Sequence, residues 1–451
     1  MQPSPSGKAV APAPWRQGVG AGPIAASALL GFVARGGEVG CKFLLQFEIA
    51  RHLGADGSGI VFLALSIVSI AATVARAGLD VSLTLHLARN TALASDGRQT
   101  NAAGAWIGSG LLITAAGSLL LAGLLALSAP AAARLLFHAP VLARPLRLMM
   151  AGIPGMALLA VLVGILNGAE RPVLGQMLGG PLWPLLALGF AFFARSAAAA
   201  NAGLAGAMLL AALIGLLLLA AQGRLAHCRF SVAAALPLLR AGWSFFVIDG
   251  VQVTLISLPT LILGAFRAPA EVGVFSLASR ISLVLTVVLI VMAGIGAPKV
   301  AIAHARGDAP RVQSVTRHLL ALALLAAAPA MILLLGVPGL LLSLFGPGFA
   351  GGGAVLRVLA LGQFAGILFC GGPTALEMTG HGSVLRRLNV LALILCVALC
   401  LMLTPVRGAA GTAWATSLTL FAYYGAAAWK AGRLLGVDCT PLCFLPMRGG
   451  Q

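Results

Sequence analysis

Apolar stretches of about 20 residues alternate with short polar segments along almost the whole chain of 451 residues. A helix of roughly 20 apolar residues is long enough to cross the hydrocarbon core of a bilayer, so each stretch predicts a membrane-spanning helix. The first half of the chain contains six such stretches, at 23–48, 58–78, 103–128, 146–168, 173–194 and 202–221. The second half contains another six, at 241–265, 272–297, 318–344, 355–379, 388–404 and 409–429. The pattern predicts an all-α integral membrane protein with about 12 transmembrane helices.

The two halves are similar to each other near their beginnings. When residues 31–67 are aligned with residues 245–281 without a gap, nine of the 37 positions are identical, and one matched pair is Gly59 with Gly273. Internal repeats of this kind are common in transporters. Because each half contains an even number of spans, both copies enter the membrane from the same side. We therefore predict two six-helix lobes, a 6+6 repeat, related by an axis along the membrane normal.

The repeat and the positions of basic residues predict five parts of the chain. If the N-terminus lies in the cytoplasm, the predicted cytoplasmic loops and tails hold 17 Lys and Arg residues and the opposite loops hold seven. Positive residues concentrate on the cytoplasmic side of membrane proteins, which favours this orientation for both termini. The parts are a cytoplasmic N-terminal tail (1–22), an N-lobe (23–222), a cytoplasmic linker (223–240), a C-lobe (241–436) and a cytoplasmic C-terminal tail (437–451).

Composition supports the same class of protein. Hydrophobic residues make up 60% of the chain, charged residues only 9%, and the mean hydropathy is +1.03, which no soluble domain requires. The formal net charge of +18 could indicate a nucleic-acid partner, but the cations are dispersed through short loops. Membrane topology and contact with anionic lipids explain such a distribution better, so we expect no nucleic acid.

The first predicted span carries three candidate site residues. Arg35, Glu38 and Lys42 are spaced i, i+3 and i+7, which places them on one face of a helix. An ionisable group inside an apolar stretch is costly unless it pairs with another group or faces a water-filled cavity. These residues therefore indicate either a polar cavity or buried ion pairs.

Four further candidates lie in the second half of the chain. Asp249 lies in the seventh predicted span, at the position that aligns with Arg35 in the repeat, and Arg280 lies in the eighth. The tenth span contains Arg357 and, near its cytoplasmic end, Glu377. For the last two residues, a structural pairing near the membrane interface competes with a role in a site.

The sequence gives no indication of a metal or another cofactor. The seven cysteines lack the further nearby ligands that a zinc site requires, and there is no Walker motif for ATP. We expect no cofactor, while coupling to protons or to sodium ions is left open.

Several segments, taken in order, resemble polysaccharide flippases. They are Leu53–Gly59 (LGADGSG), Ala77–Asp80 (AGLD), Val272–Ile281 (VGVFSLASRI), Leu344–Phe349 (LFGPGF), Leu361–Gln363 (LGQ) and Met378–His381 (MTGH). Over residues 25–435 the chain thus resembles the multidrug/oligosaccharidyl-lipid/polysaccharide (MOP) exporter superfamily, and within it the polysaccharide-biosynthesis (O-antigen type) flippases. This resemblance implies a MATE-like fold.

The resemblance also implies a cargo and a location. It implies that the protein translocates an undecaprenyl-diphosphate-linked oligosaccharide, a lipopolysaccharide or exopolysaccharide repeat unit, across a bacterial cytoplasmic (inner) membrane. The expected mechanism is alternating access, and the expected partners are glycosyltransferases, a glycan polymerase and anionic membrane lipids.

In related flippases the first, second, seventh and eighth helices line the central cavity, so the resemblance places Arg35, Lys42, Asp249 and Arg280 around the polar head of the cargo. Arginine binds phosphate oxygens in bidentate geometry. Arg35 and Arg280 are therefore expected to contact the diphosphate, and Lys42 to add positive potential. Asp249 and Glu38 would hold the arginines in the empty cavity or bind a coupling ion. Alternatively, Arg35 and Asp249 form a salt bridge that ties the lobes together without contacting cargo.

Other functions compete with this interpretation. A cation-coupled multidrug exporter of the same fold would favour acidic cavity residues. A flippase for the lipid-linked peptidoglycan precursor typically has fourteen helices. A membrane enzyme would require catalytic groups in a substantial outer loop, whereas the predicted outer loops are short and poor in acidic residues. A non-transporting scaffold would leave the ionisable residues unexplained. The sequence therefore indicates a transporter rather than an enzyme.

Overall fold

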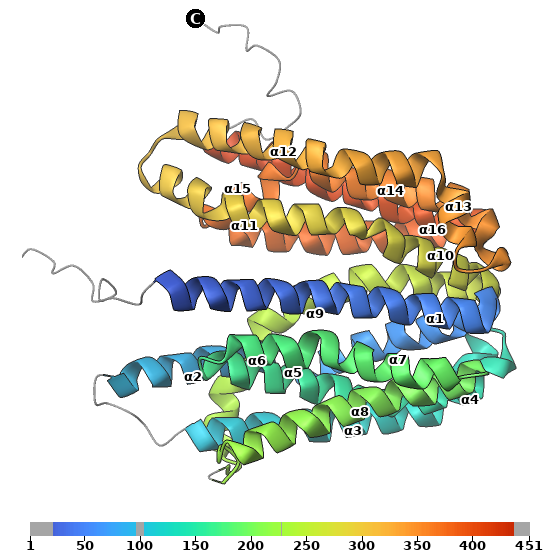
Figure 1. Cartoon of the computed structure of the whole chain (residues 1–451), viewed down its shortest axis with the longest axis horizontal. Helices are drawn as coiled ribbons and strands as arrows, with labels where there is room; N and C mark the ends of the chain where they lie inside the picture. Colours follow the sequence, from blue (N-terminus) through green and yellow to red (C-terminus); the bar gives the residue numbers. More distant parts are fainter. Residues whose placement is uncertain (1–20, 96–102, 227, 437–451) are drawn as a thin grey trace, which may run out of the picture.

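The structure, a computed structural model, describes residues 21–95, 103–226 and 228–436. These residues form helices and short connections, with no strand among them. Figure 1 shows the long helices running roughly parallel to one another in two bundles, α2 to α8 in one and α10 to α16 in the other. Helices α1 and α9 lie between the bundles, and both contact helices of each half of the chain.

In the first half of the chain, the described residues form nine helical elements and one short 3-10 turn. They are α1 (Ala21–Arg76), α2 (Leu79–Ser95), α3 (Ala103–Leu135), η2 (Pro140–Leu142), α4 (Ala143–Met150), α5 (Gly152–Gly168), α6 (Pro172–Met177), η3 (Leu178–Leu182), α7 (Trp183–Phe193) and α8 (Ala197–Ala221).

The second half begins with α9 (Val232–Phe266), the helix that spans the gap between the two bundles. The others are α10 (Pro269–Ser282), α11 (Val284–Ala305), α12 (Ala309–Gly336), α13 (Pro338–Ser343), η4 (Pro347–Gly352), α14 (Gly353–Leu368), α15 (Gly371–Met378) and α16 (Gly382–Leu435).

Two of the longest helical segments are each interrupted by a glycine. Gly54 within α1 has φ +66° and Gly408 within α16 has φ +55°, left-handed conformations that a residue without a Cβ adopts readily. By length and composition, ten helical segments of the described chain could cross a membrane, and Ala34–Arg76 and Gly382–Leu435 contain these two breaks. Each of these two segments covers a pair of predicted spans, so the predicted all-α, multi-pass fold is confirmed and the count of twelve is consistent with it.

Part of the predicted linker between the lobes is helical. Helix α8 ends at Ala221 and α9 already begins at Val232, so the second part of the predicted linker, 223–240, is helical. Hydropathy locates only the apolar part of a helix, whereas backbone hydrogen bonding continues into polar sequence. The segment before α9 is fixed by Ser231, whose N–H donates to Oγ of Ser109 at 3.0 Å. The predicted tails lie outside the described residues, except for positions 21 and 22.

The matched glycines of the repeat lie against each other's helices. A Cβ at Gly59 of α1 would collide with the carbonyl oxygen of Pro269, and a Cβ at Gly273 of α10 would collide with that of Ala55. Two helices without side chains at their crossing can approach closely, which strengthens packing inside a membrane. The crossing lies just after Gly54, at what we call the Gly54 end of the molecule; the opposite end, where α1 stops before Gly78, is the Gly78 end.

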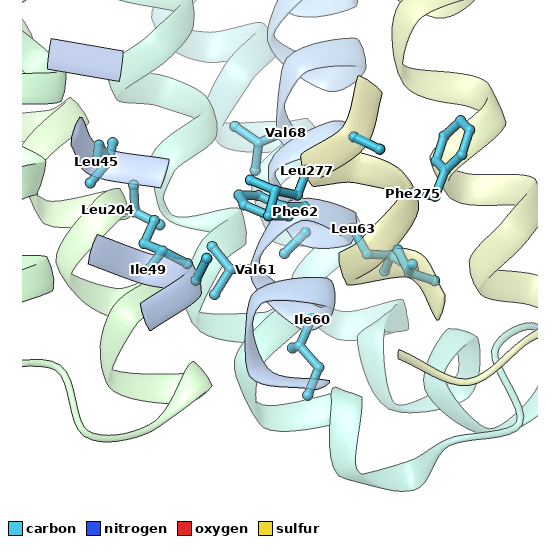
Figure 2. Close-up of a cluster of buried hydrophobic side chains, with 14 of the residues drawn as sticks. Leu45, Ile49, Ile60, Val61, Phe62, Leu63, Val68, Leu204, Phe275 and Leu277 are labelled. Atoms are coloured by element: carbon cyan, nitrogen blue, oxygen red, sulfur yellow. The ribbon is translucent and has the colours of Figure 1, made fainter. Parts of the chain in front are cut away.

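The apolar core extends from this crossing into both halves. Figure 2 shows its buried side chains, which come from α1, from α8 through Leu204, and from α10 through Phe275 and Leu277. Phe62 of α1 and Leu277 of α10 are 1% and 0% exposed, so the two halves share one core near the Gly54 end. Close packing of this kind fixes the position of α10 and of the charged residue near its end, Arg280.

Candidate substrate cavity

Three charged side chains in the first part of α1 form one ion-paired group. Glu38 accepts hydrogen bonds at both carboxylate oxygens, from Nη1 of Arg35 at 3.1 Å and from Nζ of Lys42 at 2.6 Å. Residues three and four positions apart are neighbours on a helix surface, so this contact follows from the local sequence. The carboxylate of Glu38 therefore offsets part of the positive charge of both cations.

This group lines a cavity of about 570 Å³, which we call the large cavity. It is surrounded by both parts of α1, by the start of α2, by α5, by the segment from α6 to α7 and by α9. Its uncharged polar lining residues are Ser69, Thr73, Asn167, Gln176 and Ser257. Its volume lies within the range of about 300–1,000 Å³ that is typical of small-molecule sites.

An irregular turn brings an aromatic ring to this cavity. The segment η3 is a π-helical turn that contains Gly179, Gly180 and Pro181, and it leads directly into Trp183. Because Gly180 has no side chain, the turn lies against Glu38 of α1; a Cβ there would be 3.3 Å from that side chain. The result is that the Trp183 ring lies beside Lys42, with 5.8 Å between Nζ and the ring centroid. Wide π turns within helices occur frequently at functional sites.

A second ion-paired group joins the first part of the chain to α9. Arg76 donates from Nη1 to Asp80 at 3.0 Å and from Nη2 to Asp249 of α9. Arg76 and Asp80 line the large cavity, and their side chains are 16% and 20% exposed. Asp80 lies beyond the apolar part of the span; burial raises its pKa, the positive charge of Arg76 lowers it, and the nearby carboxylate of Asp249 raises it, with a net increase. Arg76 is thus ion-paired with two carboxylates.

Close backbone packing supports this group at the Gly78 end. Ala77 and Gly78 form a turn with positive φ between α1 and α2. A Cβ at Gly78 would collide with the carbonyl oxygen of Gly242 in α9, and a Cβ at Gly242 would lie 2.8 Å from that of Ala77. The first part of α9 is therefore held against the N-terminal half of the chain, although its later part packs against α16.

A smaller cavity of about 220 Å³ contains Arg280, and we call it the small cavity. The guanidinium carbon of Arg280 lies 4.5 Å from the centroid of the Phe62 ring. Among the residues that the structure describes, no carboxylate lies within ion-pair distance of Arg280. Ser276 also lines this cavity, and its buried Oγ has no hydrogen-bond partner. The small cavity therefore contains a positive charge without a carboxylate partner and a hydroxyl group without a hydrogen-bond partner.

The two cavities adjoin each other. Six residues line both of them: Lys42, Ser69, Met156, Trp183, Ile256 and Ser257. Arg280 lies eleven residues after the first residue of α10, which corresponds to about 17 Å along the helix axis, or roughly half the hydrocarbon thickness of a bilayer. Arg280 and Lys42 therefore lie well inside the helical bundle, whereas Arg35, Arg76 and Asp80 lie toward the Gly78 end.

The structure brings together only part of the predicted site residues. Arg35, Glu38 and Lys42 line the large cavity, and Arg280 lines the small one. Asp249 does not line the large cavity itself but is bonded to Arg76, which does. Arg35 and Asp249 do not pair with each other, because each has a different ionic partner. The alternative of a salt bridge between these two residues is thus wrong.

Arg357 and Glu377 lie elsewhere. Nε of Arg357 donates to the carbonyl oxygen of Leu335 at 3.0 Å, near the end of α12. Glu377 lines a separate cavity of about 270 Å³ in the second half of the chain, together with Thr374 and Tyr424. The two residues do not pair with each other, since they lie near opposite ends of the α14–α15 segment.

Sequence reasoning missed Arg76, Asp80 and Trp183 as cavity residues. Arg76 directly precedes the motif Ala77–Asp80, which already contained Asp80, so the spacing i, i+4 could have indicated an ion pair. Trp183 follows Gly-Gly-Pro-Leu inside an apolar span, and such an interruption in a transmembrane helix could have indicated a cavity. The partnership of Arg76 with Asp249 had no signal in the sequence.

The fold is similar to those of solved membrane transporters. One is an inward-facing conformation of a multidrug resistance MATE family transporter of the MOP superfamily, with a TM-score of 0.74, 16% identity, and coverage of 88% of this chain and 94% of that chain. Another is the lipid II flippase MurJ in an inward closed conformation, with a TM-score of 0.70, 12% identity, and coverage of 90% and 87%. An outward-facing MATE transporter gives a lower TM-score of 0.57, at 14% identity and coverage of 90% and 95%. These similarities define a multi-pass membrane protein with the fold of MOP transporters and flippases.

The family of this chain follows from its sequence. Residues 25–297 match the family described as polysaccharide biosynthesis protein, and this range is more than half of the chain. The chain therefore belongs to that family, as its motifs predicted, and its fold is that of MOP transporters. No match was found among curated proteins.

Proposed function

We propose that this protein is a flippase that moves a polyprenyl-diphosphate-linked oligosaccharide, the repeat unit of a lipopolysaccharide or exopolysaccharide, across the bacterial cytoplasmic membrane. Family membership and the fold support a transporter or flippase linked to polysaccharide biosynthesis. The cargo is the part of the proposal that rests on the cavities. Its polar head would occupy them while the polyprenyl tail stays in the lipid.

The observation that carries the proposal is the unpaired guanidinium of Arg280. A cation well inside an apolar bundle is costly without a counter-charge, and here no carboxylate of the described chain supplies one. A diphosphate provides two or more negative charges with the geometry that guanidinium groups bind best. Arg35 and Lys42 add cations on the path between the Gly78 end and Arg280.

Alternating access would move the head from one side to the other. The crossing of Gly59 and Gly273 closes the Gly54 end, and the fold is more similar to an inward-facing than to an outward-facing MATE transporter. With both termini in the cytoplasm, the Gly78 end faces the cytoplasm, where the cargo is synthesised. Asp249 and Glu38 remain the candidates for binding a coupling proton or sodium ion: Asp249 shares Arg76 with Asp80, and Glu38 is bonded to both Arg35 and Lys42.

Two alternative functions differ from the proposed one in the cargo that is transported. A cation-coupled multidrug exporter would require surplus negative charge, but Arg35, Lys42, Arg76 and Arg280 line the two cavities against two carboxylates, Glu38 and Asp80. A flippase for the lipid-linked peptidoglycan precursor is the second alternative, since MurJ is among the similar folds. Drug-efflux assays in a pump-deficient strain test the first, and growth of a strain depleted of its lipid II flippase tests the second.

The central experiment compares three strains of the native organism: one lacking the gene, one with wild-type protein restored, and one with Arg280→Ala restored. Surface polysaccharide should be absent from the first and third strains and present in the second, while the membrane content of both proteins is equal. In the deletion strain, the glycosyltransferases should still assemble lipid-linked repeat units. These units should stay on the cytoplasmic side and not be joined by the polymerase. Normal surface polysaccharide in the deletion strain, without a second flippase, contradicts the proposed cargo.

A further inference from the structure

We propose that the two cavities divide the cargo between them: the small cavity binds the diphosphate, and the large cavity binds the sugar attached to it, with Trp183 as the surface against which that sugar packs. This inference rests on the proposed function and makes it more specific. It differs from the expectation that Arg35 and Arg280 both contact the diphosphate.

Charge balance separates the two cavities. The charged lining of the small cavity consists of Arg280 and of Lys42, which is bonded to Glu38, and no carboxylate of the described residues lines it. In the large cavity, Arg35 and Lys42 share Glu38, and Arg76 is bonded to Asp80 and Asp249. Three cations there face three carboxylates, so the large cavity and its ion-paired groups are close to neutral. An anionic group therefore gains most from the small cavity, and a neutral polar group fits the large one.

Size leads to the same assignment. The small cavity measures about 220 Å³, less than half the volume of the large one. The diphosphate, the more compact part of the polar head, therefore matches the small cavity better than an oligosaccharide does. The large cavity of about 570 Å³ has the volume of an ordinary small-molecule site and can hold sugar rings.

The lining of the large cavity suits hydroxyl groups. Asn167 and Gln176 present amides, which both donate and accept hydrogen bonds, and Ser69 and Thr73 present hydroxyls. The side-chain Oδ1 of Asn167 is buried and has no hydrogen-bond partner in the structure. An unpaired buried polar atom is costly, so this amide keeps hydrogen-bonding capacity that the protein itself leaves unused.

Trp183 occupies the boundary at which phosphate and sugar would meet. It lines both cavities, and its ring lies beside Lys42, which also lines both. A tryptophan ring offers a large, rigid apolar face, and the C–H face of a sugar ring packs well against such a surface. A sugar linked directly to a diphosphate held by Arg280 and Lys42 would therefore reach the face of Trp183.

The test measures binding of two soluble probes to the purified full-length protein in detergent. The probes are farnesyl diphosphate and farnesyl diphosphate carrying one N-acetylglucosamine. Wild-type protein should bind both, with the glycosylated probe about 3- to 10-fold tighter. Arg280→Ala should weaken both probes about 10- to 100-fold, because it removes hydrogen bonds to a charged group. Trp183→Ala should weaken only the glycosylated probe, by about 3- to 10-fold, as expected for loss of one aromatic contact.

Two further variants are controls for misfolding and for general effects of losing an aromatic ring. Trp183→Phe should keep most of the preference for the glycosylated probe. Trp414→Ala removes a tryptophan of α16 that lines neither cavity, and it should bind like wild type. All variants should elute from size exclusion as the wild type does.

The outcomes separate this inference from the proposed function. If wild-type protein binds neither probe, the proposed cargo is wrong, and the division of cavities falls with it. If wild-type protein binds both probes but Trp183→Ala weakens them equally or not at all, the cargo stands and the division is wrong. Equal affinity of the wild type for both probes also overturns the sugar site. The assignment of the diphosphate to the small cavity is wrong if Arg35→Ala abolishes binding of farnesyl diphosphate while Arg280→Ala leaves it unchanged.

Discussion

The two copies of the internal repeat use the same packing and different charges. Gly59 of α1 and Gly273 of α10 occupy matched positions, and each allows the close approach of the other's helix. At another pair of matched positions, Arg35 pairs with Glu38 on its own helix, while Asp249 binds Arg76 of the opposite half. The repeat therefore preserves the contacts that hold the halves together, and it has diverged where the cavity chemistry lies. Backbone packing requires the same small residue in both copies, whereas the large cavity is lined by Arg35 and not by its counterpart Asp249, so the two charges need not match.

The largest effect is expected at the shared packing. Gly59→Ala places a Cβ against the backbone carbonyl of Pro269, which cannot rotate away, and we expect a loss of about 3 kcal/mol or more in the free energy of unfolding. The measurement is the yield of monodisperse protein and its thermal unfolding temperature in detergent. Gly206→Ala is the matched control, since a Cβ there meets no atom within 4 Å. Equal behaviour of the two variants would falsify the proposed role of the crossing.

A smaller effect is expected at the ion pair between the halves. Arg76→Ala leaves two nearby carboxylates without their cation, and we expect it to destabilise the protein by about 2 kcal/mol. Asp249→Asn should cost less than about 1 kcal/mol, because the amide oxygen can still accept from Arg76 and Asp80 remains paired.

A double-mutant cycle of Arg76→Ala and Asp249→Ala measures the coupling between these two residues. The same cycle at Arg35 and Glu38 should give a weaker coupling, because the Arg35 side chain is 64% exposed and exposed ion pairs contribute little. A stronger coupling at Arg35 than at Arg76 would reverse the contrast between the two copies.

The smallest effect is expected at Arg357. Its guanidinium donates to the carbonyl oxygen of Leu335 and lines neither cavity, so Arg357→Ala should cost about 1 kcal/mol of stability. Surface polysaccharide should be retained at more than half the wild-type amount, in contrast to its loss in Arg280→Ala. Immunoblots of surface glycan, normalised to membrane protein, make the comparison. Loss of glycan in Arg357→Ala at normal protein levels would extend the site beyond the two cavities.

Much of the fold follows from local sequence. Each predicted span is mostly helical, although several cover two or more consecutive helical elements, because some 20 apolar residues satisfy their backbone in lipid chiefly as helix. The contacts of Glu38 with Arg35 and Lys42 follow in the same way, since the period of the helix makes residues three or four apart neighbours. Helix ends were predicted less well, as the early start of α9 at Val232 illustrates.

The membrane class, the repeat, the family and the residues that share a face of α1 can all be read from the sequence. The structure was needed to show that Asp249 binds Arg76, that Arg280 has no carboxylate partner in the described chain, and that Trp183 lies between two cavities. This division arises because helix geometry fixes neighbours within about four residues. Which face of one helix meets which face of another depends on the packing of all of them together.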